Sequence, residues 1–272
     1  MTTLHQNRKN IPFIKESKGK RKLVMLTAYT SSVANNIDPY VDIILVGDSL
    51  GMVIYGFNDT LSVSLDMMIA HGSAVARSSK NACVVVDMPF GSYQESKSQA
   101  FRNAAHILSA TKASGVKLEG GEEMAETVYF LHKRGIPVMG HIGLMPQKFN
   151  ISGGFKALSP DQHIVDNVIS EAIALEQSGA FALVLECVAE SIGKKVTEAV
   201  NIPVIGIGAS SDCDGQVLVV DDILGMNPDS SLKFVKTYAN VGKDIQHAAK
   251  CYAEEVRSGM FPSKENYFFA KK

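Results

Sequence analysis

The chain has 272 residues, of which 46% are hydrophobic and 20% are charged, an ordinary composition for a globular protein. Its formal net charge of −1 argues against nucleic acid or an anionic membrane as the main partner. No apolar run approaches the ~18 residues that span a bilayer, and the basic N-terminus lacks the apolar segment of a secretory signal. Four cysteines are scattered without a CxxC pair, so we expect reduced thiols and a cytoplasmic protein.

Short, continuously apolar segments recur along the chain and predict strands. They lie at 23–29, 41–47, 83–88, 115–118, 136–140, 181–185, 202–207 and 216–220. Between most of them, helical periodicity predicts helices at 65–79, 95–113, 122–134, 161–178 and 191–200. Apolar strands that alternate with helices indicate parallel strands covered on both faces.

Eight predicted strands without a Pro/Gly/Ser-rich linker favour one domain, 1–272, folded as a single (β/α)₈ TIM barrel. We expect an N-terminal extension at 1–20, the barrel core at 21–230, and C-terminal covering helices with a tail at 231–272. Segment 232–258 predicts one or two of these helices. A doubly wound open sheet is the structural alternative.

Polar residues stand at the ends of the predicted strands two to six. In chain order they are Asp48, Ser49, Asp87, Lys117, Glu119, His141 and Glu186. Active sites of such barrels lie at the carboxyl ends of the strands, so we expect these side chains to converge on one rim.

Each of these residues has a structural explanation when it is taken alone. Asp48 or Asp87 would cap the next helix. Lys117 and Glu119 would form a plain ion pair, and His141 would be a hydrogen-bonded structural histidine. Glu186 beside a buried strand needs a partner or a raised pKa. All of these explanations would have to hold at the same rim, which favours a site.

The available ligands are oxygens, without a Cys/His cluster, which suits Mg²⁺ and does not suit structural zinc. A metal with open positions would chelate a small oxygen-rich substrate such as a 2-keto acid and stabilise its enolate as a Lewis acid. Lys117 would neutralise a carboxylate, and Glu186 would remove a proton α to the carbonyl. The residues themselves therefore predict metal-assisted enolisation.

Seven motifs together resemble one known family. They are LTAY (26–29), VGDSLGMV (46–53), DMPFGSYQ (87–94), VKLEGG (116–121), GHIGLMPQ (140–147), LVLECV (183–188) and IPVIGIGA (202–209). They occur in the order found in ketopantoate hydroxymethyltransferases, and the resemblance runs from about residue 20 to 268. It implies a (β/α)₈ barrel enzyme of pantothenate biosynthesis.

The resemblance also implies an activity. The family transfers a hydroxymethyl group from 5,10-methylenetetrahydrofolate to 3-methyl-2-oxobutanoate, giving 2-dehydropantoate and tetrahydrofolate, with one Mg²⁺ per subunit. Its members are homo-oligomers, often decamers. Two alternatives stay open: another Mg²⁺-dependent lyase or mutase acting on a related keto acid, and a degenerate barrel without catalysis.

The matching motifs imply site residues. Asp48 and Asp87 match the metal-binding acids, and Glu119 matches the third acid near the metal, which reaches it through water. Glu186 matches the base that takes the C3 proton, and His141 is a candidate for supporting the site or touching the substrate. Keto-acid contacts are implied for Asp48, Ser49, Asp87 and Lys117.

The chain departs from the family pattern at a few places. Thr30 replaces the aspartate of LTAYD, and KALSP (156–160) replaces a K-V-Q-G-R segment. Ser210 replaces the second glycine of GIGAG, while Ser62 and Ala189 replace prolines. None of these changes removes a predicted metal ligand or the base. We expect the KALSP change to reshape a loop after the fifth strand and to alter folate or rim contacts more than the chemistry, and Ser210 to stiffen a turn.

Overall fold

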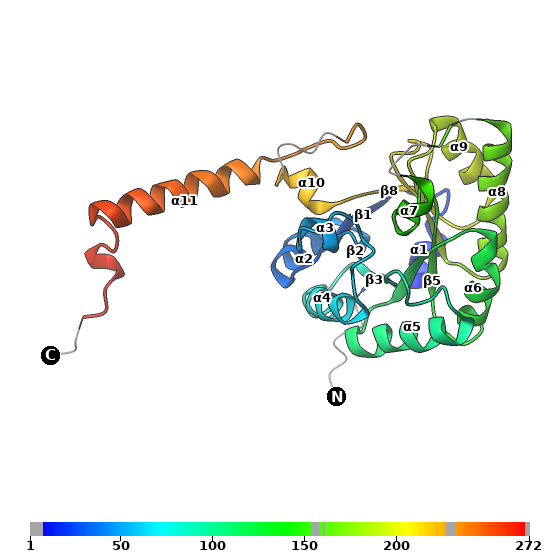
Figure 1. The fold of residues 1–272 in the computed structure, drawn as a ribbon, viewed down its shortest axis with the longest axis horizontal. Coiled ribbons are helices and arrows are strands. Elements are labelled where there is room, and N and C mark those ends of the chain that lie inside the picture. Colours follow the sequence, from blue (N-terminus) through cyan, green and yellow to red (C-terminus); the bar gives the residue numbers. More distant parts are fainter. Residues whose placement is uncertain (1–7, 154–157, 160, 227–231, 270–272) are drawn as a thin grey trace. The chain divides into compact units, whose positions relative to one another are not determined.

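The computed structural model describes residues 8–153, 158–159, 161–226 and 232–269 (Figure 1). The chain divides into two compact units, Met1–Val219 and Val220–Lys272. The first unit is built on parallel strands that close into a barrel in the order β1 to β8. The strands are β1 (Leu23–Thr27), β2 (Ile43–Val46), β3 (Cys83–Asp87), β4 (Gly115–Glu119), β5 (Val138–Gly143), β6 (Ala182–Glu186), β7 (Val204–Ile207) and β8 (Gly215–Leu218).

Helices connect most of these strands, and Figure 1 shows α4, α5, α6 and α8 on the outside of the barrel. The α-helices of this unit are α1 (Ile11–Glu16), α2 (Ser31–Ile37), α3 (Leu50–Val53), α4 (Leu65–Ser78), α5 (Lys97–Thr111), α6 (Ala125–His132), α7 (Phe149–Ser152), α8 (Gln162–Gln177) and α9 (Glu190–Ala199). Single 3₁₀ turns are η1 (Asp38–Tyr40), η2 (Glu122–Met124) and η3 (Pro146–Lys148). Residues 208–214, all of them described, link β7 to β8 without a helix.

Alternation along the strands separates the barrel interior from the surface that the helices cover. Met25, Val85 and Met139 belong to one buried cluster inside the barrel. Ile14 of α1 belongs to the same cluster and is fully buried. Its neighbours there include Leu23, the first residue of β1, so α1 fills the amino-terminal end of the barrel. The N-terminal extension therefore contributes to the core.

Side-chain caps explain where several helices begin. Ser64 and Ser96 accept hydrogen bonds from the backbone N–H groups of Met67 (3.2 Å) and Gln99 (3.1 Å), at the first turns of α4 and α5. Thr30 accepts one from the N–H of Val33 at 3.3 Å and caps α2. Threonine, like the aspartate that it replaces in the family pattern, can thus cap this helix.

The second unit contains α10 (Val220–Leu224), α11 (Val241–Ser258) and the 3₁₀ turn η4 (Lys264–Asn266). No residue of α11 is buried. The segment predicted to hold one or two helices thus holds one long α-helix in its described part. The covering role predicted for 231–272, within a single domain 1–272, stays a prediction.

The closed parallel barrel confirms the predicted (β/α)₈ class and excludes the open-sheet alternative. Each predicted strand range overlaps an observed strand, and each predicted helix range overlaps an observed helix. Among the described residues, no helix is both long and apolar enough to cross a membrane.

Candidate active site

Strand alternation carries polar side chains into the barrel at the carboxyl ends of β3 to β6. Asp87 follows the inward-facing Val85, and Glu186 follows Val184, because residues two apart on a strand share a face. The strand register pairs Asp87 with Lys117 and Glu119 with His141. The register therefore brings acids, an amine and an imidazole from four strands to one rim, as the sequence predicted.

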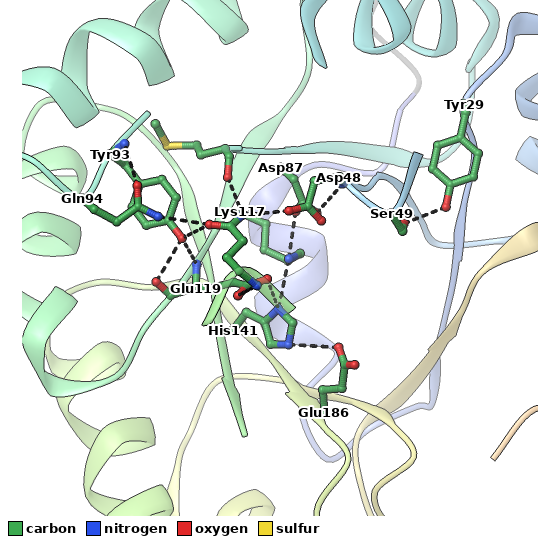
Figure 2. A network of polar contacts seen from close by, with 12 residues as sticks. Tyr29, Asp48, Ser49, Asp87, Tyr93, Gln94, Lys117, Glu119, His141 and Glu186 are labelled. Atoms are coloured by element: carbon green, nitrogen blue, oxygen red, sulfur yellow. Dashed lines mark hydrogen bonds and ion pairs between the residues drawn. The ribbon is translucent and has the colours of Figure 1, made fainter. Parts of the chain in front are cut away.

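Four of these side chains form a continuous line of contacts (Figure 2). Lys117 Nζ lies 2.9 Å from Asp87 Oδ1 and 3.1 Å from His141 Nδ1. His141 Nε2 in turn lies 3.2 Å from Glu186 Oε2. The side chains of Asp87, Lys117 and His141 are 3–4% exposed, whereas that of Glu186 is 16% exposed. Glu186 is therefore the member of the line that a bound molecule can reach.

The contacts of His141 define its protonation. An ammonium group only donates hydrogen bonds, so His141 Nδ1 must offer a lone pair to Lys117. Burial, followed by the positive charge of Lys117, lowers the pKa of His141. The ring is accordingly neutral, with its proton on Nε2, which lies 3.2 Å from Glu186 Oε2 without the geometry of a hydrogen bond.

The acids of this rim are not balanced by the cations around them. Burial is the main cause that raises the pKa of Asp87 to about 7, with Lys117 opposing and Asp48 adding to the effect. Burial and the charge of Asp48 also raise the pKa of Glu119 well above its ordinary value. The pKa of Lys117 is raised because nearby carboxylates outweigh its own burial, so the amine stays charged. Several carboxylates thus share one ammonium group.

Asp48 lies just beyond β2 and joins the same group. Its backbone N–H donates to Asp87 Oδ2 at 3.0 Å, and its carboxylate is buried against the loops that follow β3 and β5. The N-cap residue of α3 is Ser49, which makes no side-chain capping bond, while the Asp48 carboxylate accepts from the Gln147 side chain. Ser49 lies at the same turn, where its hydroxyl is 2.8 Å from Tyr29 Oη.

Two site residues were missed by the reasoning from sequence, Tyr93 and Gln147. The Gln147 amide donates to Asp48 Oδ2 (2.8 Å) and its backbone N–H donates to Glu119 Oε2 (3.0 Å). The Tyr93 hydroxyl lies 2.7 Å from Gln147 Oε1 and accepts from the Glu119 N–H at 3.1 Å. Both residues lie in motifs quoted above, DMPFGSYQ and GHIGLMPQ. Those motifs were the available signal, but loop residues carry no strand periodicity that shows where they point.

The donor set fits Mg²⁺ as an incomplete protein site. Among the described residues, no group of three or more His, Cys, Asp or Glu side chains is arranged to hold a metal ion. Glu119 Oε1 is nevertheless a buried oxygen without a hydrogen-bond partner, and Asp87 Oδ1 contacts the Lys117 ammonium group at 2.9 Å without a well-directed hydrogen bond; both acids lie near the Asp48 carboxylate. Mg²⁺ is usually held by one or two carboxylates, with water and substrate oxygens completing its shell. Acids with such oxygens suit that kind of binding.

One departure from the family pattern, Ser210, makes its contacts outside this group of acids. Ser210 is buried after β7, where its hydroxyl donates to Glu190 Oε1 at 3.2 Å and accepts from the Asp212 N–H at 3.1 Å. The serine makes its own turn contacts without a left-handed backbone. Three residues of the KALSP segment (156–160), namely 156, 157 and 160, fall outside the described residues. The predicted effect of that segment on folate contacts stays a prediction.

A closed parallel barrel whose strands end in buried acids and a partly exposed carboxylate has the architecture of a (β/α)₈-barrel enzyme. The sequence model of ketopantoate hydroxymethyltransferase matches residues 8–264. The chain therefore belongs to the ketopantoate hydroxymethyltransferase family and is a transferase.

Individual relatives agree with this assignment. The 3-methyl-2-oxobutanoate hydroxymethyltransferase of Bordetella petrii is 57% identical over 97% of this chain and 96% of its own length. The Brucella suis enzyme of the same name is 56% identical, over 95% and 94%. Phosphonopyruvate hydrolase in complex with oxalate and Mg²⁺ has a TM-score of 0.60 over 94% of this chain and 92% of its own. At 12% identity, this last likeness shows the fold alone.

Proposed function

We propose that this chain transfers a hydroxymethyl group from 5,10-methylenetetrahydrofolate to 3-methyl-2-oxobutanoate, with Mg²⁺ held by Asp48 and Asp87. Glu119 would reach the ion through water. The observation that carries the proposal is the position of Glu186, a partly exposed carboxylate beside buried acids that lack balancing charge. The names of the relatives above supply the keto acid.

Glu186 is the proposed base for the proton on C3 of the keto acid. Its Oε2 atom lies 3.2 Å from the protonated Nε2 of His141. That N–H group would turn toward the carboxylate when the substrate binds and would leave the remaining lone pairs of the carboxylate for the substrate. Because His141 is neutral, it orients Glu186 without removing the negative charge that a base needs.

Lys117 and Ser49 are the proposed contacts to the keto acid, together with Asp48 and Asp87. The Lys117 ammonium group is fixed between Asp87 and His141, so its charge is already oriented before a substrate carboxylate arrives. The Ser49 hydroxyl is held by Tyr29 at the same rim. Bound Mg²⁺ would supply Lewis-acid chemistry, drawing electron density from the keto acid and so acidifying its C3–H bond.

The proposed reaction balances as follows. The C3–H bond breaks and its proton moves to Glu186, while its electron pair forms the enolate. The enolate carbon then forms a C–C bond with the methylene carbon of the folate. Both bonds from this methylene carbon to the folate nitrogens break. Water provides the new hydroxyl group, and the two folate nitrogens take up two protons, one from that water and one that Glu186 took from C3, so that tetrahydrofolate leaves.

The direct test is an assay of the purified chain with both substrates, in Mg²⁺ and in a chelator. We expect 2-dehydropantoate, measured by mass spectrometry, only when the folate, the keto acid and Mg²⁺ are all present. Without the folate, NMR should still show Mg²⁺-dependent exchange of the C3 proton for deuterium. Oxaloacetate and phosphonopyruvate serve as comparison substrates, and faster turnover of either would favour the lyase or mutase alternative. Inactivity toward every substrate would favour the non-catalytic barrel.

The predicted assembly is part of the same proposal. The family resemblance implies a homo-oligomer, often a decamer, and light scattering of the purified chain measures its mass in solution. A monomeric mass would contradict this part of the proposal and would leave the proposed chemistry unchanged.

A further inference from the structure

Gln147 is a buried, uncharged side chain at the centre of the acidic group. It lies in η3, immediately after β5, and is 5% exposed. Its amide nitrogen donates to Asp48 Oδ2 (2.8 Å) and to the carbonyl oxygen of Met88 (3.0 Å). Its amide oxygen accepts from Tyr93 Oη (2.7 Å) and from Gln94 Nε2 (3.1 Å). Every one of these contacts crosses from the loop after β5 to the loops after β2 and β3.

The orientation of the Gln147 amide follows from its partners. A backbone carbonyl only accepts hydrogen bonds, so the amide group beside Met88 must be the NH₂. Burial and the nearby charge of Glu119 raise the pKa of Tyr93 well above its ordinary value, so this hydroxyl keeps its proton. It can then donate to Gln147 Oε1. The NH₂ group is therefore fixed in the direction of Asp48.

Gln147 binds two of the three acids proposed for the Mg²⁺ site. Its amide holds one oxygen of Asp48, and its backbone N–H holds one oxygen of Glu119. The charge of Asp48 raises the cost of ionising Glu119, because Asp48 is among the causes that raise the pKa of Glu119. A cationic side chain here would balance that charge by itself. A neutral donor fixes the oxygens and leaves their charge for a cation.

We propose that Gln147 is a positioning residue that holds Asp48 and Glu119 in place for Mg²⁺. This inference rests on the Mg²⁺ site of the proposed function. Residues that hydrogen-bond to metal ligands typically account for ~10- to 100-fold in metal affinity. Gln147 needs no contact with the metal or the substrate to act in this way.

The test is the Gln147→Met variant, which keeps the side-chain length and removes both polar groups. Calorimetry of the full chain with MgCl₂, without substrates, should give a dissociation constant ~10- to 100-fold weaker than that of the unchanged chain. In the C3 exchange assay, the Mg²⁺ concentration for half-maximal rate should rise by a similar factor. The rate at saturating Mg²⁺ should change by only a few fold.

Gln94→Leu is the matched control. Gln94 is exposed and donates to the same Gln147 oxygen, and its own Oε1 accepts from the Gly91 N–H. This variant removes one hydrogen bond from Gln147 on the side away from Asp48, so its Mg²⁺ affinity should stay within about twofold of the unchanged chain. A comparable weakening in both variants would show a general loosening of the loops and would overturn the proposal.

Tyr93→Phe keeps the proposal testable if Gln147→Met does not fold. It removes the hydroxyl that fixes the amide direction, and should weaken Mg²⁺ binding several fold by freeing Gln147 to rotate. Unchanged affinity in a folded Gln147→Met, or in Tyr93→Phe where the former does not fold, would overturn the inference. If the unchanged chain itself does not bind Mg²⁺, the metal site of the proposed function fails and this inference fails with it.

Discussion

Buried carboxylates at the two ends of the barrel differ in how fully they are hydrogen-bonded. At the amino-terminal ends of the strands, the Asp38 carboxylate accepts from the backbone N–H groups of Lys80, Asn81 and Ala82 and from the Asn81 side chain. At the same end, Asp214 accepts from Lys18 Nζ (2.8 Å) and from the Val204 N–H (2.9 Å). At the carboxyl ends, Glu119 retains a buried oxygen without a hydrogen-bond partner, and Asp87 Oδ1 has an ion pair with Lys117 (2.9 Å) but no well-directed hydrogen bond.

The pKa shifts follow the same division. Burial alone would raise the pKa of Asp38, but its hydrogen bonds outweigh burial and lower it. For Asp87 and Glu119 burial wins, and the pKa rises. The charged form is therefore stabilised by folding at one end of the barrel and destabilised at the other. The number of hydrogen bonds that a buried carboxylate accepts thus distinguishes acids that stabilise the fold from acids that are available to a ligand.

The largest expected effect comes from Glu186→Gln, which removes the proposed base and keeps its shape. C3 proton exchange, followed by NMR, should fall by ~10²- to 10⁴-fold, the usual contribution of a general base. The thermal midpoint should change little, because Glu186 is partly exposed. Glu190→Gln makes the same charge change on an exposed residue at the start of α9 and should retain exchange. Equal rates in the two variants would remove Glu186 from its proposed role.

Asp38→Asn tests the opposite end of the barrel. The amide keeps one acceptor oxygen and presents an NH₂ group to buried N–H donors, so the free energy of unfolding should fall by about 2–4 kcal/mol. The lowered pKa of Asp38 places its contribution above about pH 3.8, and the contribution is lost as the pH falls through the folded value. Chemical denaturation at pH 7 measures the change. An accompanying loss of Mg²⁺ affinity would contradict the division between the two ends.

Mg²⁺ binding itself should depend on pH. The pKa of Asp87 is raised to about 7. At pH 6 the Asp87 carboxyl therefore carries a proton in most molecules, which a cation must displace, and at pH 8 it is ionised in most molecules. The dissociation constant should therefore be roughly tenfold weaker at pH 6 than at pH 8. Calorimetry in buffers of different ionisation enthalpy would count the displaced protons. A constant affinity across this range would show that Asp87 is not a ligand.

The smallest expected effect is a gain of stability from Glu119→Gln in the metal-free chain. Because the pKa of Glu119 is raised in the folded state, its contribution to stability becomes less favourable as the pH rises above about 4.5. A neutral isostere removes that cost, so unfolding at pH 8 should require about 1 kcal/mol more. The gain should disappear near pH 4.5. A loss of stability at pH 8 would show that Glu119 supports the fold as Asp38 does.

The strands could be predicted because parallel strands covered on both faces read as short, continuously apolar segments in the sequence. Apolar runs that end in Asp87, Glu119 and Glu186 give both the position of the strand end and the face that each acid occupies. Parallel register then brings these acids to a common rim without further information. The family motifs added expectations about their roles, which the predictions above test.

The positions of Gln147 and Tyr93 could not be predicted in this way. Both lie in loops, where side-chain direction depends on the path of the backbone rather than on a repeat. Tyr93 and Gln147 are 54 positions apart in the sequence, and their side chains meet beside the Asp48 carboxylate, which Gln147 binds. A contact between residues so far apart in the chain has no local sequence signal. The filling of the barrel end by Ile14 was missed for a similar reason, since a six-residue helix has too few residues to show a clear periodicity.

Barrel closure has a consequence for synthesis of the chain. The pairing of Leu23 with Gly215 joins the first strand to the last, so β1 lacks one neighbour until nearly the whole first unit has left the ribosome. Until then both β1 and β7 expose backbone groups that invite pairing with another nascent chain. A truncation before Gly215 should therefore aggregate, although it would contain every residue assigned here to the reaction.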